Sequence, residues 1–200
     1  MIYHSIEQNT PEWMELRRGK FTSSTFSDLF AKPSTLTYQK AIYKVVYERM
    51  TGEQAEEGYK NSYMERGHAM EVLAKNWYEQ EKFCLVDNGG FCEPEDELLG
   101  WIGDSPDGLV EQDGTVEIKS KIFNTMIDCL LNKKIPTTHY WQIHGHIYIA
   151  DRAWCDYVIY HPKLTPFIIR VNRDEKVIAE LKEKLKESIE YAQSIIEKLK

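Results

Sequence analysis

Apolar residues recur every three to four positions along several stretches of this 200-residue chain, a spacing typical of helices that bury one side. Helix-capping residues precede these stretches: Thr10 before Pro11, the pair Ser23-Ser24, Thr137, and Asn172 with Glu175 three positions later. The pattern predicts helices at residues 11–16, 24–30, 36–51, 62–82, 124–131, 138–149 and about 174–199.

Shorter alternating stretches, bounded by glycine, proline and acidic turns, predict strands. Three of them, at residues 83–86, 90–92 and 98–102, precede a hairpin at residues 105–120, and we expect all three to join it in one sheet. Two more follow at residues 153–160 and 166–171. Together the elements predict one α/β domain over residues 1–200, a mixed central β-sheet flanked by α-helices.

The hairpin between Ser105 and Ser120 carries the residues best suited to chemistry, and its predicted turn is Asp113-Gly114. Because side chains alternate along a strand, Glu117 and Lys119 share one face and the apolar residues beside them share the other. Antiparallel pairing brings Asp107 near the level of Glu117. Two carboxylates and an ammonium group therefore converge.

Carboxylates held this close repel one another, and a hard cation such as Mg²⁺, with Mn²⁺ as a substitute, relieves the repulsion. Asp107 and Glu117 are the predicted metal ligands, together with the backbone oxygen of Ile118. The alternative is a surface hairpin in which Glu117 and Lys119 form an ordinary ion pair.

A third carboxylate, Glu71, lies on the mostly apolar stripe of the helix at residues 62–82, where a charge needs a partner. That partner is either a metal ion or a salt bridge to Arg66 or Lys75.

The segment around Arg17 and Ser24 is suited to bind a phosphate, because a guanidinium, serine hydroxyls and free helix-start amides would lie together. A capped helix beside a surface arginine is the other interpretation.

The net charge of −7 is unevenly distributed: residues 51–118 carry −13, residues 1–50 carry +2 and residues 119–200 carry +4. A protein that encloses DNA needs only a basic lining, so this charge permits DNA as a partner. Four scattered cysteines predict neither a zinc site nor disulfides. The chain has no apolar run of membrane-spanning length and no signal-peptide pattern, which predicts a cytoplasmic protein without a membrane partner.

Three histidines, His139, His144 and His146, lie on one predicted helix without the spacing of a zinc motif. We expect ordinary helix residues there, and the sequence assigns them no role.

Several motifs in order along the chain resemble one nuclease family. Asp107 followed by Glu117-Ile118-Lys119 resembles the PD-(D/E)-x-K signature, and Ser-Pro-Asp-Gly-Leu before it resembles the phage lambda exonuclease and YqaJ-type viral recombinase branch. Further similar blocks are Trp13–Gly19 with Thr22–Ser24, Gly67 with Glu71, Tyr140–His144 and Arg173–Lys176. Ser23, Trp141 and His144 depart from the residues usual in this branch.

The resemblance implies a restriction-endonuclease-like fold and metal-dependent 5′ to 3′ exonuclease activity on double-stranded DNA. It implies catalytic roles for Asp107, Glu117 and Lys119, a metal-ligand role for Glu71, and DNA or 5′-phosphate contacts at Arg17, Ser24, Ser105 and Gln142. It also implies a single-strand annealing protein as partner, a ring of three subunits, and a bacterial or phage-infected host cell. An endonuclease on the same scaffold and a non-catalytic module that binds DNA ends or a partner are the alternatives.

Overall fold

The computed structural model describes residues 1–55, 62–120 and 123–200, with only the backbone for residues 62–69 and 123–125. Its helices are α1 (Pro11–Arg17), α2 (Ser23–Leu29), α3 (Leu36–Thr51), α4 (Ser62–Lys82), α5 (Phe123–Asn132), α6 (Thr137–Ile149) and α7 (Glu175–Leu199). Its strands are β1 (Ile2–His4), β2 (Phe21–Thr22), β3 (Val86–Asn88), β4 (Phe91–Glu93), β5 (Ile102–Gly103), β6 (Gly108–Val110), β7 (Gly114–Lys119), β8 (Trp154–Ile159) and β9 (Phe167–Asn172).

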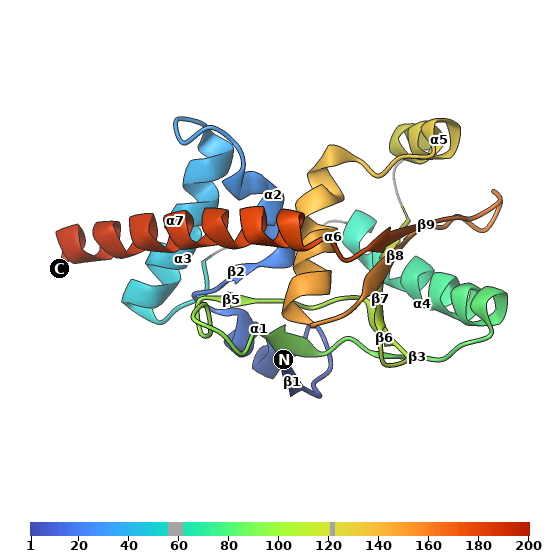
Figure 1. Cartoon of the computed structure of the whole chain (residues 1–200), viewed down its shortest axis with the longest axis horizontal. Helices are drawn as coiled ribbons and strands as arrows, with labels where there is room; N and C mark the ends of the chain where they lie inside the picture. The colour runs from blue at the N-terminus through green and yellow to red at the C-terminus, as the bar shows by residue number, and fades with distance from the viewer. Residues whose placement is uncertain (56–61, 121–122) are drawn as a thin grey trace.

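The central sheet has the strand order β3-β6-β7-β8-β9, and only the pair β7–β8 is parallel (Figure 1). The predicted mixed sheet flanked by helices is therefore confirmed. The predicted bounds of the helices at residues 36–51 and 62–82 also agree with α3 and α4. No helix in the described ranges is long and apolar enough to cross a bilayer.

Helices cover the two faces of the sheet with different cores. On one face, Ala74 and Tyr78 of α4 pack against Val116 and Ile118 of β7. On the other, α6 lies between the sheet and the helices α2 and α7 (Figure 1). The strand β7 is consequently enclosed on both sides, and its residues from Gly114 to Ile118 are all buried.

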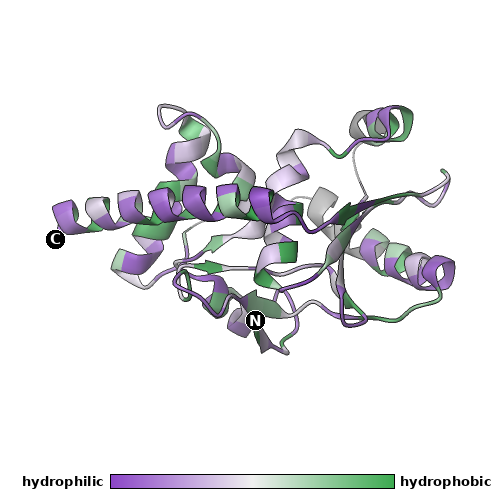
Figure 2. Ribbon diagram, in the orientation of Figure 1, coloured by the Kyte–Doolittle hydropathy of each residue, from purple (hydrophilic) through white to green (hydrophobic). Residues whose placement is uncertain are grey.

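The last helix, α7, is amphipathic as predicted, and Figure 2 shows its apolar residues set among hydrophilic ones. Its buried stripe runs from Ile178 to Ala192 and packs on α3 and α6. Leu199, at the end of the stripe, is exposed.

Two of the three strands expected to join the hairpin do not do so. Only β3 pairs with β6, whereas β4 pairs with β1 and β5 pairs in parallel with β2. The reason is packing: Ile102 of β5 lies opposite Phe21 of β2, and both side chains are buried in the main core. Strands as short as β1 and β2 carry no periodicity that the sequence could have revealed.

The turn of the hairpin also differs from the prediction. The loop is residues 111–113, and Gly114 is the first residue of β7, paired with Val110. A Cβ atom at Gly114 would lie 2.2 Å from the Trp154 ring, so the glycine is required by packing and not by the turn. The positive φ of 49° is at Glu111 instead.

Three predicted helix caps are wrong. Ser23 is the first residue of α2, Thr137 is the first residue of α6 after Pro136, and Asp174 caps α7 in place of Asn172. The Asp174 side chain accepts the backbone N–H of Lys176 at 2.9 Å. The Ser23 hydroxyl instead donates to a buried carboxylate, which takes it away from the helix end.

A buried carboxylate, Asp156 on β8, fastens α4 to the sheet. It accepts the Tyr78 hydroxyl at 2.7 Å and two N–H groups of Arg170 at 2.8 and 2.7 Å. We predict that Tyr78→Phe lowers the free energy of unfolding by about 1.5–3 kcal/mol, because a hydrogen bond to a buried charged acceptor is lost. Urea denaturation measures the change, with the exposed Tyr43→Phe as control. Equal stability of the two variants would contradict the prediction.

Candidate active site

The hairpin places Asp107 beside β7. Asp107 directly precedes β6, and its Oδ2 accepts the backbone N–H of Ile118 at 2.6 Å. Because the N–H and C=O of a strand residue point to the same side, the Ile118 carbonyl also faces the side of Asp107. The pairing of Gly108 with Val116 brings Asp107 level with Glu117, as the sequence predicted.

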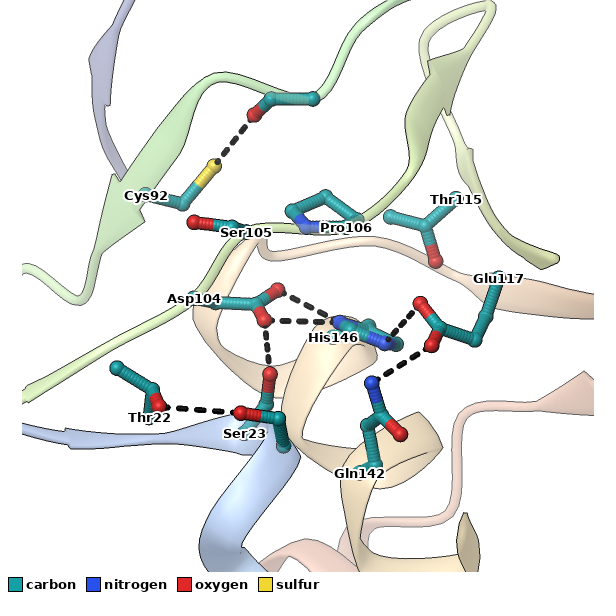
Figure 3. Close-up of polar contacts among 12 residues, drawn as sticks. Thr22, Ser23, Cys92, Asp104, Ser105, Pro106, Thr115, Glu117, Gln142 and His146 are labelled. Atoms are coloured by element: carbon teal, nitrogen blue, oxygen red, sulfur yellow. Dashed lines mark hydrogen bonds and ion pairs between the residues drawn. The ribbon is translucent and has the colours of Figure 1, made fainter. Parts of the chain in front are cut away.

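The Glu117 carboxylate lies under α6, only 1% exposed. Its Oε1 accepts the Gln142 side-chain amide at 2.7 Å and forms an ion pair with Lys119. Its Oε2 lies 3.0 Å from Nε2 of His146, although neither atom has a hydrogen-bond partner in the described chain. Gln142, expected to contact DNA, thus holds a predicted metal ligand in this structure (Figure 3).

Behind Glu117, His146 continues a buried polar chain that the sequence did not predict. Its Nδ1 lies 2.8 and 2.9 Å from the two carboxylate oxygens of Asp104, and Asp104 accepts the hydroxyl of Ser23 (Figure 3). Asp104 and His146 are both 0% exposed. Gln142 and His146 are four residues apart on α6, so both side chains lie on the face of the helix that contacts Glu117. That helical spacing was the only sequence signal that His146 belongs to this cluster.

The charges of this cluster shift one another's ionisation. Burial alone would raise the pKa of Glu117, but Lys119 and His146 outweigh it and hold that pKa well below its usual range. Burial likewise would lower the pKa of His146, but Asp104 and Glu117 raise it to about 10. The imidazole is therefore a cation at neutral pH.

Asp107 behaves in the opposite way. Burial, with the repulsion of Glu117, raises its pKa well above the usual value despite the nearby Lys119. Burial would lower the pKa of Lys119, but Glu117 and Asp107 raise it, so Lys119 remains an ammonium ion.

Glu71 is close enough for its charge to contribute to the raised pKa values of both Asp107 and Lys119. The helix α4 thus brings the third predicted carboxylate to the same site. Of the two salt-bridge partners suggested for it, the side chain of Arg66 lies outside the described residues.

Of the four residues predicted to contact DNA or a 5′-phosphate, Arg17, Ser24 and Ser105 lie in one polar group, whereas Gln142 lies at Glu117. The Arg17 guanidinium donates to the Ser105 hydroxyl at 3.3 Å and to the Thr22 hydroxyl at 3.2 Å, and Thr22 contacts Ser24 at 3.2 Å. Trp13, which the sequence placed in a family block without a role of its own, donates its ring N–H to Ser105 at 2.9 Å, and the guanidinium of Arg17 lies 4.2 Å from its ring. We call Trp13, Arg17, Thr22, Ser24 and Ser105 the hydroxyl–arginine pocket.

The other two histidines lie elsewhere. His139 contacts the Tyr157 hydroxyl at 2.7 Å, and His144 packs 4.6 Å from the Tyr140 ring, where burial lowers its pKa.

The donor set fits a hard divalent ion. Asp107 and Glu117 are oxygen donors of the kind that such an ion prefers, and burial together with the repulsion of Glu117 raises the pKa of Asp107, a repulsion that a divalent ion between the two carboxylates would relieve. In the described residues no three His, Cys, Asp or Glu side chains already converge tightly enough to hold a metal ion. Lys119 and His146 instead neutralise Glu117 here.

A mixed sheet whose central hairpin carries Asp107, Glu117 and Lys119 matches the arrangement expected for the PD-(D/E)-x-K nuclease class. The model of the YqaJ-like viral recombinase domain matches residues 12–153, and the chain belongs to that family. The resemblance inferred from the sequence motifs is thereby confirmed.

Solved structures extend the comparison over most of the chain. An alkaline exonuclease from Laribacter hongkongensis, LHK-Exo, is 29% identical, with a TM-score of 0.86 over 95% of this chain and 96% of that chain. The same protein in complex with dAMP gives a TM-score of 0.87 at 29% identity and the same coverage. A phage-related exonuclease from Haemophilus somnus 129PT shares the fold at 16% identity, with a TM-score of 0.70 over 94% of this chain and 100% of that chain. None of the curated proteins compared with the chain matches it.

The raised pKa of Asp107 means that its charge opposes folding when no metal is bound. The native state then holds the proton more tightly than the unfolded state, so stability falls as pH rises from the usual value of 3.8 toward the raised pKa. We predict that Asp107→Asn, neutral at every pH, stabilises the metal-free protein near neutral pH, because it removes the buried charge whose pKa is raised. The gain should shrink toward about pH 4.

Urea denaturation in EDTA at acid and neutral pH checks this expectation. Asp113→Asn, in the exposed loop of the hairpin, is the control and should show no such gain. If the parent protein is as stable as the Asp107→Asn variant at neutral pH, the charge of Asp107 does not destabilise the folded protein and the prediction is wrong.

Proposed function

We propose that this protein is a metal-dependent 5′ to 3′ double-stranded DNA exonuclease that acts from duplex ends in phage-type recombination. The observation that carries the proposal is the joining of two sites by one short loop. Ser105 belongs to the hydroxyl–arginine pocket, and Asp107, two residues later, belongs to the carboxylate site. Both sites can therefore engage one DNA end.

The similarity to solved exonucleases supports this reaction class. LHK-Exo, which aligns over nearly the whole chain, is an alkaline exonuclease whose structure has been solved in complex with dAMP. Membership of the recombinase family supports the recombination role.

The carboxylates would hold Mg²⁺, with Mn²⁺ as a substitute, through Asp107, Glu117, Glu71 and the backbone oxygen of Ile118. The chemistry supplied by a bound ion of this kind is polarisation of the scissile phosphate and a lower pKa for the attacking water. Lys119, held as an ammonium ion, would orient that water and offset charge on the phosphate. Gln142 and His146 would hold Glu117 in place.

Further parts of the proposal follow from family resemblance. A single-strand annealing protein would receive the remaining strand, and three subunits would form a ring around the duplex in a bacterial or phage-infected cell. Sedimentation at working concentration tests the ring.

An endonuclease on the same scaffold is the rival function. The hydroxyl–arginine pocket favours the exonuclease, because a 5′-phosphate exists only at a strand end.

We predict that Asp107→Ala and the isosteric Glu117→Gln abolish hydrolysis of linear duplex while circular dichroism shows an intact fold. Lys119→Ala should still bind metal and DNA but lower kcat on the order of 10²–10⁴-fold. Glu71→Gln should weaken Mg²⁺ binding, measured by calorimetry. Unchanged turnover in the Asp107 or Glu117 variant would remove this site from the reaction.

We also predict that the enzyme prefers a 5′-phosphate over a 5′-hydroxyl end and that Arg17→Ala erases most of this preference. Loss of one charge-assisted contact costs about 1.5–3 kcal/mol, which corresponds to a roughly ten- to hundredfold slower cleavage of phosphorylated ends. Linear duplexes with either end are compared with a closed circle. Equal rates on both ends would refute the phosphate pocket, and a cut circle would favour the endonuclease.

A further inference from the structure

The buried chain Ser23–Asp104–His146–Glu117 joins the two halves of the proposed site. Ser23 lies between Thr22 and Ser24 of the hydroxyl–arginine pocket and donates its hydroxyl to Asp104. Asp104 contacts Nδ1 of His146, whose Nε2 lies 3.0 Å from Glu117 (Figure 3). Every link is a polar contact between side chains that are at most 2% exposed.

Burying these four connected polar side chains is energetically unfavourable. Two carboxylates and an imidazolium are removed from water, and such buried ion sets often contribute little net stability compared with apolar packing. Asp104 is also fixed on its other flank, because its neighbour Ser105 accepts the N–H of Trp13 and of Arg17. A change in the pocket therefore reaches Asp104 both through Ser23 and along the backbone.

We propose that Asp104 and His146 are positioning residues that couple the hydroxyl–arginine pocket to Glu117, so that a 5′-phosphate in the pocket and a divalent ion at Glu117 favour each other's binding. Nδ1 of His146 contacts the Asp104 carboxylate and Nε2 lies 3.0 Å from the Glu117 carboxylate, so a shift of Asp104 would change the distance and angle of the ring to Glu117. Because coupling between two ligands is reciprocal, each ligand improves the affinity for the other by the same factor. The inference rests on the proposed function, which places a phosphate and a metal at these two positions.

The first experiment reads His146 without metal or turnover. In EDTA, the imidazole N–H signals of His146 are recorded by NMR and identified by their loss in His146→Gln. Addition of a short duplex with a 5′-phosphate should shift these signals, and the same duplex with a 5′-hydroxyl should not.

Ser23→Ala separates coupling from direct proximity, because it removes one hydroxyl and leaves Arg17 and Ser24 in place. The phosphorylated duplex should still bind this variant, but the His146 signals should no longer shift. Ser27→Ala, on the same helix, is the matched control, since Ser27 Oγ is buried with no hydrogen-bond partner in the described chain. It should behave like the parent.

The second experiment measures the Mg²⁺ concentration needed for half-maximal cleavage. In the parent this concentration should be lower for 5′-phosphate than for 5′-hydroxyl ends, by a factor on the order of 5–150. The factor should fall toward one in Ser23→Ala and Asp104→Asn. Asp104→Asn should also raise the Mg²⁺ requirement on the order of 10- to 100-fold, as expected for a residue that orients a metal ligand. His144→Gln, a buried histidine on the same helix, is the control for α6.

The outcomes separate the two proposals. If the parent prefers phosphorylated ends and Ser23→Ala keeps both the NMR shift and the Mg²⁺ factor, the coupling is overturned while the exonuclease stands. The opposite result is that the parent cleaves no duplex end while the phosphorylated duplex still shifts the His146 NMR signals in a Ser23-dependent manner. In that case the proposed function is wrong, but the coupling between the hydroxyl–arginine pocket and His146 stands.

Discussion

The burial of the Glu117 carboxylate is the constraint on which the rest of the structure depends. A charge in the middle of the central sheet costs several kcal/mol unless donors surround it. Its own strand supplies only Lys119, so α6 must lie over β7 in the one register that brings Gln142 and His146 to the same carboxylate. This requirement explains the polar residues Gln142 and His146 in the buried part of α6, which runs from Gln142 to Ile149.

On the opposite face of the sheet, a buried carboxylate likewise connects the covering helix to the sheet. Asp156 on β8 lies next to Val116 of β7, and its carboxylate accepts the hydroxyl of Tyr78 from α4 and the guanidinium of Arg170 from β9. Each covering helix is thus fixed to the sheet by a buried carboxylate as well as by apolar contacts. The two carboxylates differ in use: Asp156 has donors for both of its oxygens, whereas Glu117 keeps one oxygen without a hydrogen bond.

Local patterns predicted the parts of this structure that depend on neighbouring residues. The hairpin, the level of Asp107 with Glu117, and the long helices follow from alternation and helical spacing. The pairing of β1 with β4 and of β2 with β5 could not be read in this way, because strands of two or three residues gain their stability from distant partners. The Asp104–His146 contact could not be predicted for the same reason, since 42 residues separate the two side chains along the sequence. Ser23 was misread as a cap because the hydroxyl's actual acceptor lies on that distant segment.

The loop Ser105-Pro106-Asp107 sets the distance between the two halves of the site, and its surroundings hold it firmly. The Pro106 carbonyl accepts the Gln8 side-chain amide at 2.8 Å, and a Cβ atom at Gly89 would lie 1.7 Å from the same oxygen. Only glycine permits so close an approach. Two residues of chain span at most about 7 Å, so Ser105 of the hydroxyl–arginine pocket and Asp107 of the carboxylate site lie a short, fixed distance apart along the backbone. In the proposed function, a terminal phosphate held at Ser105 would place a bond near the end of the strand beside Asp107 and Glu117. The fixed loop, more than any single catalytic group, would then make the reaction proceed from an end.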